Sequence, residues 1–306
     1  MKTIIITGGL GHIGSNLIPY LLDRDCEVIC IDNLLTQRLT SLRGLIGNDA
    51  FQFYDLDLAS EGLCLQDVIH DKKIDAIVHL AAITNAEASH DKADEVHNNN
   101  FNSTKNIVNF CKDQNIKLIF PSSTSVYGSA DDEVFEDDSS VLKPQSPYAE
   151  SKVNEENLII NSLDSNFNIL RLGTIFGASP GMRFHTAVNK FCWQATLNLP
   201  ITVWKTAMDQ YRPYLALSDA CEAIHFFINN DYPGQVFNVL TQNYTVHDIL
   251  ETIKNFTDIE IQFVESKIMN QLSYLVSNKK ITSLGFKFEG NLDLAIQDTI
   301  NWLTKN

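Results

Sequence analysis

The feature that most constrains this chain is a run of closely spaced glycines between a strand-like segment and a helix-like segment. Residues 3–7 are mostly β-branched, and apolar residues then recur at helical spacing from Ile13 to Leu22. Between these segments the chain reads Thr7-Gly8-Gly9-Leu10-Gly11-His12-Ile13-Gly14. Glycines at this spacing allow a tight turn and let backbone N–H groups approach a phosphate at the N-terminus of the helix. The pattern therefore predicts a strand–turn–helix unit that binds a pyrophosphate.

The same alternation of short apolar runs and longer helical-period segments continues through the first half of the chain. Such alternation is typical of βαβ units and predicts a Rossmann-type, doubly wound parallel α/β sheet. We expect strands at 3–7, 27–31, 76–80, 117–121 and 168–172. After about residue 174 the alternation loosens, although residues 235–240 again have the pattern of a strand.

An aspartate after the second predicted strand indicates which dinucleotide would bind. Asp32 lies eighteen residues beyond Gly14. A carboxylate there can accept hydrogen bonds from the ribose hydroxyls of adenosine, and it repels a 2′-phosphate. We therefore expect NAD rather than NADP. The expected organisation is a NAD-binding Rossmann domain over residues 1–173, with a return segment near 212–241, and a smaller mixed α/β region, mainly for substrate binding, over 174–306.

The charge of the chain argues against several classes of partner. The 306 residues include 23 Lys and Arg and 38 Asp and Glu, which gives a formal charge of −15. Such a charge repels nucleic acids and anionic membrane surfaces, so we expect neither as a partner. No apolar stretch is long enough to cross a bilayer, and we expect a cytoplasmic protein. The six cysteines form no Cys-x-x-Cys pair, and no metal site is expected.

A tyrosine and a lysine four residues apart form a second candidate site. In Tyr148-Ala149-Glu150-Ser151-Lys152 the phenol and the ammonium lie on one helix face, and Ser146 and Pro147 before them suit a helix start. A nearby positive charge favours the phenolate of a tyrosine, which can then act as a base. The hydroxyl cluster Ser122-Ser123-Thr124-Ser125 follows the strand predicted at 117–121, at the edge where ligands of parallel sheets bind.

Taken together, these motifs resemble the extended short-chain dehydrogenase/reductase family, in its NAD-dependent nucleotide-sugar epimerase/dehydratase branch. The resemblance also includes Asp57-Leu58, His79-Leu80-Ala81-Ala82, the Asn100-x-x-Ser103-Thr104 helix start and Ser122-Ser123-x-x-Val126-Tyr127-Gly128. It implies Tyr148 as acid/base, Lys152 as the residue that holds the nicotinamide ribose, and Ser123 as the residue that aligns a substrate oxygen.

The resemblance also implies sets of binding residues. The expected cofactor-binding residues are Gly8, Gly11, His12, Ile13, Gly14, Asp32, Asn33, Asp57, Leu58, Leu80, Ala81, Ala82, Asn100, Tyr148 and Lys152. The expected substrate-binding residues are Thr84, Ser123, Thr124, Thr174, Arg183, Asn189 and Arg212. The implied partner is a nucleotide sugar, whose diphosphate Arg212 would bind, and many relatives are homodimers, so a homodimer is expected.

Several reactions fit such a site. We expect epimerisation of a nucleotide hexose at C4 through a transient 4-keto sugar. Dehydratases of the branch carry an Asp-Glu pair after the catalytic Ser or Thr, whereas this chain has Thr124 and Ser125. A dehydratase, a reductase and a decarboxylase remain alternatives within the family. A non-catalytic dinucleotide sensor is an alternative of a different class, although binding NAD alone does not require the Tyr148 and Lys152 pair.

Overall fold

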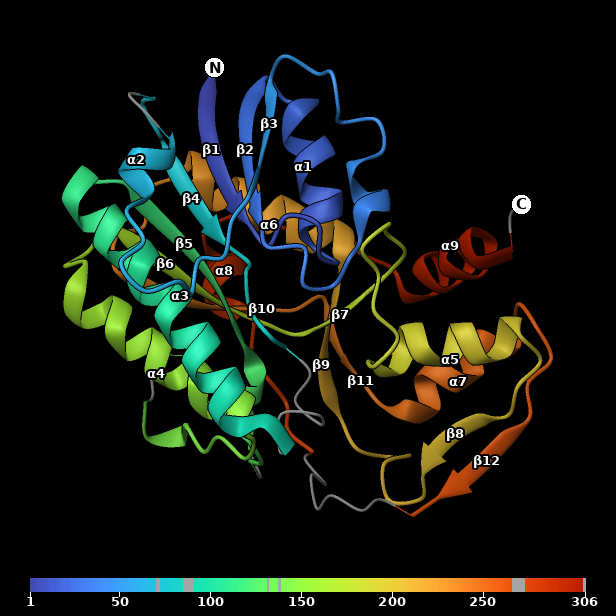
Figure 1. Cartoon of the computed structure of the whole chain (residues 1–306). Coiled ribbons are helices and arrows are strands. Elements are labelled where there is room, and N and C mark those ends of the chain that lie inside the picture. Colours follow the sequence, from blue (N-terminus) through green and yellow to red (C-terminus); the bar gives the residue numbers. More distant parts are fainter. Residues whose placement is uncertain (70–71, 85–90, 131, 137–138, 266–272, 305–306) are drawn as a thin grey trace.

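A seven-stranded parallel sheet forms the centre of the molecule (Figure 1). The computed structural model describes residues 1–69, 72–84, 91–130, 132–136, 139–265 and 273–304. The strands of the large sheet are β1 (Lys2–Thr7), β2 (Cys26–Asp32), β3 (Phe51–Asp55), β4 (Ala76–His79), β5 (Lys117–Ser123), β6 (Phe167–Leu172) and β10 (Gln235–Val239). The predicted fold class is confirmed.

The order of these strands positions the ligand site. Their order across the sheet is β10-β6-β5-β4-β1-β2-β3, so the chain reverses its direction of winding between β1 and β4. Ligands of open parallel sheets bind at the carboxyl ends of the strands, beside such a switch point. The glycine turn follows β1 and the Leu80-Ala81-Ala82 segment follows β4, so both lie at this point.

Helices cover both faces of the large sheet (Figure 1). On one face, side chains of α1 (Gly14–Leu22) and α6 (Leu217–Asn229) pack with the strands around Ile4, Ile6 and Val28. On the other face, α2 (Leu65–Ile69), α3 (Ala93–Gln114) and α4 (Pro147–Ser162) pack around Ile5, Ile77 and Leu118. Both faces of the strands are buried, which explains why the strands read as continuous apolar runs.

The ends of two helices follow from local sequence. Ser146 is the N-cap of α4, and its Oγ accepts a hydrogen bond of 3.2 Å from the Ala149 N–H, while Pro147 occupies the first helical position. This confirms the helix start predicted at these residues. Helix α3 ends at Gln114, and Asn115 after it adopts the left-handed conformation (φ 53°) common at helix ends.

The second half of the chain forms a smaller region and also completes the large sheet. Its strands are β7 (Thr174–Phe176), β9 (Arg212–Ala216) and β11 (Gln242–Tyr244) in one sheet, and β8 (Ile201–Trp204) and β12 (Ile261–Val264) in another. Its helices are α5 (Ala187–Thr196), α7 (Val246–Lys254), α8 (Lys279–Ser283) and α9 (Leu292–Thr304). Strand β10 pairs with β6, so a late segment returns to the first sheet. None of the helices in the described ranges combines the length and the apolar character needed to span a bilayer.

Candidate active site

The glycine turn brings the chain unusually close to neighbouring backbone. Gly8 has a φ of 64°, and a Cβ atom there would lie 2.6 Å from the Ala81 nitrogen. At Gly14 a Cβ atom would lie 2.5 Å from the Gly9 backbone. Gly11 differs, because its Cβ would meet little besides Gly8 O at 3.2 Å and the Arg183 guanidinium at 3.8 Å. A Cβ atom at Gly9 would lie 2.5 Å from the buried Cys30 Sγ, so the turn has no room for a side chain at Gly8, Gly9 or Gly14, whereas Gly11 faces a cavity.

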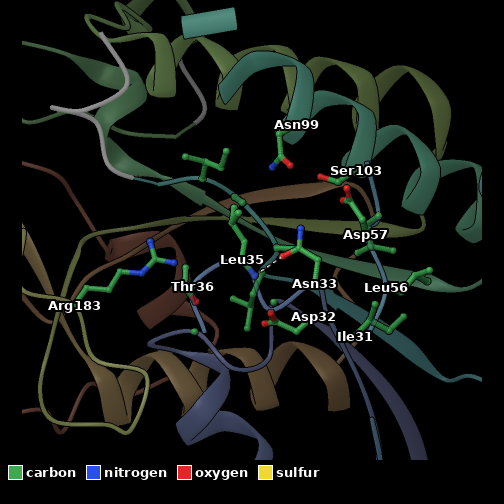
Figure 2. A pocket seen from close by; sticks show the side chains of 17 residues that line it. Ile31, Asp32, Asn33, Leu35, Thr36, Leu56, Asp57, Asn99, Ser103 and Arg183 are labelled. Atoms are coloured by element: carbon green, nitrogen blue, oxygen red, sulfur yellow. Dashed lines mark hydrogen bonds between the residues drawn. The ribbon is translucent and has the colours of Figure 1, made fainter. Parts of the chain in front are cut away.

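A smaller cavity of about 70 Å³ lies at the carboxyl ends of β1, β2 and β3. Backbone N–H groups orient Asp32: Leu10 donates to its Oδ2 (3.1 Å) and Leu34 to its Oδ1 (3.0 Å). Figure 2 shows Arg183 on one side of this cavity and Asp57 on the other. The residues predicted from the sequence that line it are Gly8, Gly11, Asp32, Asn33, Asp57, Leu58, Leu80, Ala81, Ala82 and Arg183.

A larger cavity of about 440 Å³ adjoins the first, and the two share Gly8, Gly11, Leu80, Ala82 and Arg183. It lies between the large sheet and the smaller region, because α4 and α5 both contribute to its walls. The predicted residues that line it are Gly8, Gly11, His12, Ile13, Gly14, Leu80, Ala82, Thr84, Ser123, Thr124, Tyr148, Lys152, Thr174, Arg183 and Arg212.

The structure brings the three predicted catalytic residues to this larger cavity. Tyr148 and Lys152 lie one turn apart on α4, and Ser123 lies at the end of β5. Ser123 Oγ accepts hydrogen bonds from the Ser125 N–H (3.1 Å) and the Ser125 hydroxyl (2.9 Å). With both acceptor positions occupied, the Ser123 proton is free to be donated toward Tyr148 or a ligand.

Burial raises the pKa of Tyr148, while the Lys152 charge, the Arg183 charge and the hydrogen bond with Ser123 act to lower it. Burial would also lower the pKa of Lys152, but the Glu155 carboxylate and the Tyr148 phenol outweigh that effect and raise it. Lys152 therefore stays charged, as a residue that supports a phenolate must.

The larger cavity is rich in cationic side chains, and the part of its lining that the structure describes has no carboxylate. Among the described residues no Asp or Glu side chain lines it, although the chain carries 38 acidic residues. Lys152, Arg183, Lys190 and Arg212 line it, and they come from α4, α5, β9 and the segment before α5. Burial, followed by the charges of Arg183 and Arg38, lowers the pKa of His185 to about 4, so that His185 is neutral at pH 7. Such a cavity favours an anionic ligand.

Two predicted binding residues lie behind the cavities rather than at their surfaces. Asn100 is fully buried, accepts from the Ile83 N–H (2.8 Å) and donates to the Ile83 carbonyl (3.0 Å). Asn189 accepts from the Gly177 N–H (3.2 Å) and donates to the Arg183 carbonyl (3.3 Å). Neither lines a cavity. Their amide groups are occupied by these backbone bonds, so they support the ligand-facing segments instead of contacting a ligand.

The sequence motifs missed other lining residues. Asn99 and Ser103 of α3 reach the smaller cavity, as Figure 2 shows. Gln145, His185 and Lys190 line the larger one, together with Thr202 and Trp204 of β8. Ser103 belongs to a recognised motif, whereas the others belong to none. In the described ranges, no group of three or more His, Cys, Asp or Glu side chains could hold a metal ion.

Comparison with known proteins identifies the family. The sequence model of the NAD dependent epimerase/dehydratase family matches residues 4–239, more than two thirds of the chain. The chain belongs to this family. The resemblance to extended short-chain dehydrogenases and the expected cofactor, NAD, are thereby confirmed. The glycine turn, Asp32 and the Tyr148 and Lys152 pair all lie within the matched segment.

Individual relatives of this epimerase/dehydratase family member differ in the reactions they catalyse. It is 27% identical to a trifunctional UDP-glucose 4,6-dehydratase/UDP-4-keto-6-deoxy-D-glucose 3,5-epimerase/UDP-4-keto-L-rhamnose-reductase of Arabidopsis thaliana, with 100% of this chain and 47% of the relative covered. It spans about half the length of each of the three plant trifunctional relatives it matches. A dTDP-D-glucose 4,6-dehydratase of Mus musculus is 26% identical, with 100% and 89% covered.

A solved structure is similar over nearly the whole chain. It is a UDP-N-acetylglucosamine 4-epimerase from Methanobrevibacter ruminantium M1, in complex with UDP-N-acetylmuramic acid. The TM-score is 0.88 at 25% identity, with 98% of this chain and 97% of the other covered. The relatives named here thus include both an epimerase and dehydratases of nucleotide sugars.

Proposed function

We propose that this enzyme is an NAD-dependent epimerase that inverts C4 of a nucleotide hexose. The observation that carries the proposal is the meeting of Ser123, Tyr148 and Lys152 on a cationic cavity that no described carboxylate lines. Ser123, Tyr148 and Lys152 can together remove a proton from a sugar hydroxyl, and the cationic side chains can bind the diphosphate of the substrate.

The adjoining cavities fit an extended dinucleotide. Asp32 and Asp57 stand in the smaller cavity, where they suit adenosine, and Lys152 stands in the larger one. Between these ends lies Gly11, where the absence of a side chain leaves room for a pyrophosphate at the start of α1. NAD bound in this way would accept a hydride from the sugar carbon and return it to the opposite face.

The protein side chains would move and hold the proton. Tyr148, as phenolate, takes the proton from the 4-hydroxyl while the C–H bond of C4 is broken, and returns it after the 4-keto sugar has turned over. Lys152 stabilises the phenolate by its charge. Ser123 donates its free proton toward the same sugar oxygen. The hydride and the proton both return to the sugar, so the reaction has no net redox change.

Cationic side chains of the smaller region could bind the diphosphate of the substrate. Arg212 and Lys190 line only the larger cavity, and Arg183 lines both cavities. A diphosphate held there leaves the hexose to reach Tyr148 with few fixed contacts, which a sugar that must turn over requires. Hydroxyls of Thr84, Thr124, Ser125 and Thr174 surround the space for the hexose.

Dehydration is the second candidate, because the plant and mouse relatives are named as 4,6-dehydratases. Elimination of water needs a base at C5 and an acid at C6. By the family resemblance, Thr124 and Ser125 stand where dehydratases carry carboxylic acids, and the described lining of the cavity offers no carboxyl group in their place. This composition favours epimerisation over dehydration. Reduction, decarboxylation and a sensor role have no comparable observation in their favour.

The test uses a panel of UDP-, GDP-, CDP- and dTDP-hexoses. The panel includes hexuronic acids, because no described Asp or Glu side chain lines the larger cavity to repel their carboxylates. NMR of the sugar after incubation, with and without added NAD, identifies the product. We expect a 4-epimer at equilibrium with its substrate and no turnover by Tyr148→Phe. Accumulation of a 4-keto-6-deoxy sugar would show that the enzyme is a dehydratase and not an epimerase. Binding of NAD without turnover of any sugar in the panel would favour a non-catalytic dinucleotide sensor.

A further inference from the structure

A buried carboxylate contacts the lysine of the proposed catalytic pair. Glu155 lies on α4, three residues after Lys152, and is 0% exposed, while Lys152 is 2% exposed. Lys152 Nζ lies 3.0 Å from Glu155 Oε2, and this is both a hydrogen bond and an ion pair. The sequence motifs single out Tyr148 and Lys152 but say nothing of Glu155.

Glu155 is held in place by two further hydrogen bonds. The Ser151 hydroxyl donates to Oε1 (2.9 Å) and the Thr104 hydroxyl donates to Oε2 (2.9 Å). Thr104 comes from α3, so the carboxylate joins two helices of the same layer. With three donors and no exposed surface, the carboxylate cannot rotate freely, and bulk solvent does not reach it to compete for Lys152.

The bonds continue beyond Thr104 in one fixed direction. Because the Thr104 proton goes to Glu155, its oxygen must accept from His79 Nε2 (3.1 Å). His79 then carries its proton on Nε2, and its Nδ1 accepts from the Thr7 hydroxyl (2.7 Å). Thr7 Oγ1 in turn accepts from the Ala81 N–H (3.1 Å). The series therefore joins Ala81, which lines the smaller cavity, to Lys152.

No other member of this series can balance the charge of Lys152. Burial, followed by the charge of Lys152, lowers the pKa of His79 to about 3, so that His79 is neutral at physiological pH. Glu156 is paired with Arg171 of β6, with 2.7 Å between Oε2 and Nη2. The other cation acting on Tyr148 is Arg183. Glu155 is therefore the anion that directly opposes Lys152.

We propose that Glu155 is a positioning residue that fixes Lys152 toward the cofactor and offsets part of the charge by which Lys152 supports the Tyr148 phenolate. Glu155 thereby makes the Tyr148 phenolate less favourable than Lys152 alone would make it, and the positive charge of an oxidised nicotinamide, when bound, would favour the phenolate. This inference deepens the proposed function and rests on it for its catalytic meaning, although its electrostatic content can be measured without a substrate.

The test measures the pH at which Tyr148 ionises. ¹³C NMR of Cζ-labelled tyrosine monitors this ionisation in the protein saturated with NAD. The Tyr148 signal is identified by its loss in Tyr148→Phe. Glu155→Gln keeps the size of the side chain and an oxygen that can accept from Lys152 and Thr104, but it removes the charge. We expect the midpoint of Tyr148 to fall by about one pH unit, a tenfold increase in its ionisation constant.

The matched control is Glu150→Gln on the exposed side of the same helix, which should leave the midpoint within 0.2 pH unit (about the precision of such a titration). Glu155→Asp, which keeps the charge, should stay closer to wild type than the glutamine variant. If the glutamine variant does not fold, Glu155→Ala removes the same charge. A midpoint that is unchanged or raised in the neutral variant, with only a lower melting temperature, would overturn the proposal.

The pH profile of kcat/KM separates this inference from the proposed function. With an active nucleotide sugar, the acid limb should move down by the same amount as the Tyr148 midpoint. If no nucleotide sugar turns over but the NMR midpoint falls, the proposed function fails and the electrostatic role stands. If turnover is normal and neither midpoint nor acid limb moves, the role of Glu155 is wrong and the function stands.

Discussion

The backbones of Gly8 and Ala81 lie so close together that a Cβ atom on Gly8 would stand 2.6 Å from the Ala81 nitrogen. Gly8 follows β1 and Ala81 follows β4, so this contact joins the two strands at which the sheet reverses its winding. Both residues line the smaller cavity. The fit of the cofactor and the packing of the sheet thus depend on the same missing side chain.

Gly8→Ala should therefore destabilise the protein more than the same substitution at a glycine that has a positive φ but no close neighbours. Gly62 is the control, since its φ is also positive (73°) and a Cβ atom added there would meet nothing within 4 Å. We expect the free energy of unfolding to fall by about 1 kcal/mol in both variants, because alanine is strained at a positive φ. In Gly8→Ala it should fall by about 1–3 kcal/mol more, because the new Cβ atom overlaps the Ala81 backbone. Chemical unfolding and NAD titration measure the two effects. Equal losses would show that the backbones separate easily.

Asp32→Ala should weaken NAD binding by about tenfold or more, because both the ribose contact and the anchoring of the Leu10 and Leu34 N–H groups are lost. The rise in melting temperature caused by a fixed NAD concentration should shrink accordingly. Asp23→Asn, an exposed change at the end of α1, is the control. Unaltered NAD stabilisation in the Asp32 variant would place the adenosine elsewhere.

Arg183 and Arg212 should differ in which ligands they affect. Arg183 lines both cavities, whereas Arg212 lines only the larger one. Arg183→Ala should weaken both NAD and the nucleotide sugar by about tenfold each, and Arg212→Ala only the nucleotide sugar. Isothermal titration with NAD, followed by KM for the sugar nucleotide, distinguishes the two. Loss of NAD affinity in the Arg212 variant would contradict the proposed arrangement.

Acid should destabilise the enzyme through His79. Its pKa is about 3 when folded and about 6.5 when unfolded, so below pH 6.5 the unfolded chain binds a proton that the folded chain does not. Stability is lost as the pH falls from about 6.5 toward 3, at about 1.4 kcal/mol per pH unit. Between pH 6.5 and 5, wild type should lose about 2 kcal/mol more than His79→Gln.

Urea unfolding at a series of pH values measures that difference in slope. His247→Gln, a substitution at an exposed histidine, is the control. Parallel curves for wild type and His79→Gln would mean that His79 gains a proton without unfolding.

The parts of the fold that sequence could predict are those with a local pattern. The β-branched runs predict strands within two residues of β1, β2, β4, β5 and β6, and Ser146-Pro147 predicts the start of α4. The smaller region is predicted only as mixed α/β, because its strands are short and pair across long gaps, as β7 does with β9 and β8 does with β12. Nothing local specifies such pairing.

The site divides in the same way. Motif residues such as Asp57 and Tyr148 reach the cavities, whereas Asn100 and Asn189 bond to backbone that comes near only after folding. Glu155 lies one residue from Glu156 in the sequence, yet one contacts Lys152 and the other Arg171. The homodimer, the cytoplasmic location and the absence of nucleic-acid partners stay predictions.

The return of β10 to the large sheet bears on how this chain can be divided. Strand β10 borders β6, and α6 from the same late segment covers the sheet around Phe227 and Ile224. A fragment ending at Gly173 would carry the whole glycine turn and the Tyr148 helix, yet its last strand would have an open edge and a bare apolar face beside it. Autonomous folding of the amino-terminal half is therefore not to be expected, and synthesis of the chain must pass residue 239 before the nucleotide-binding half can close.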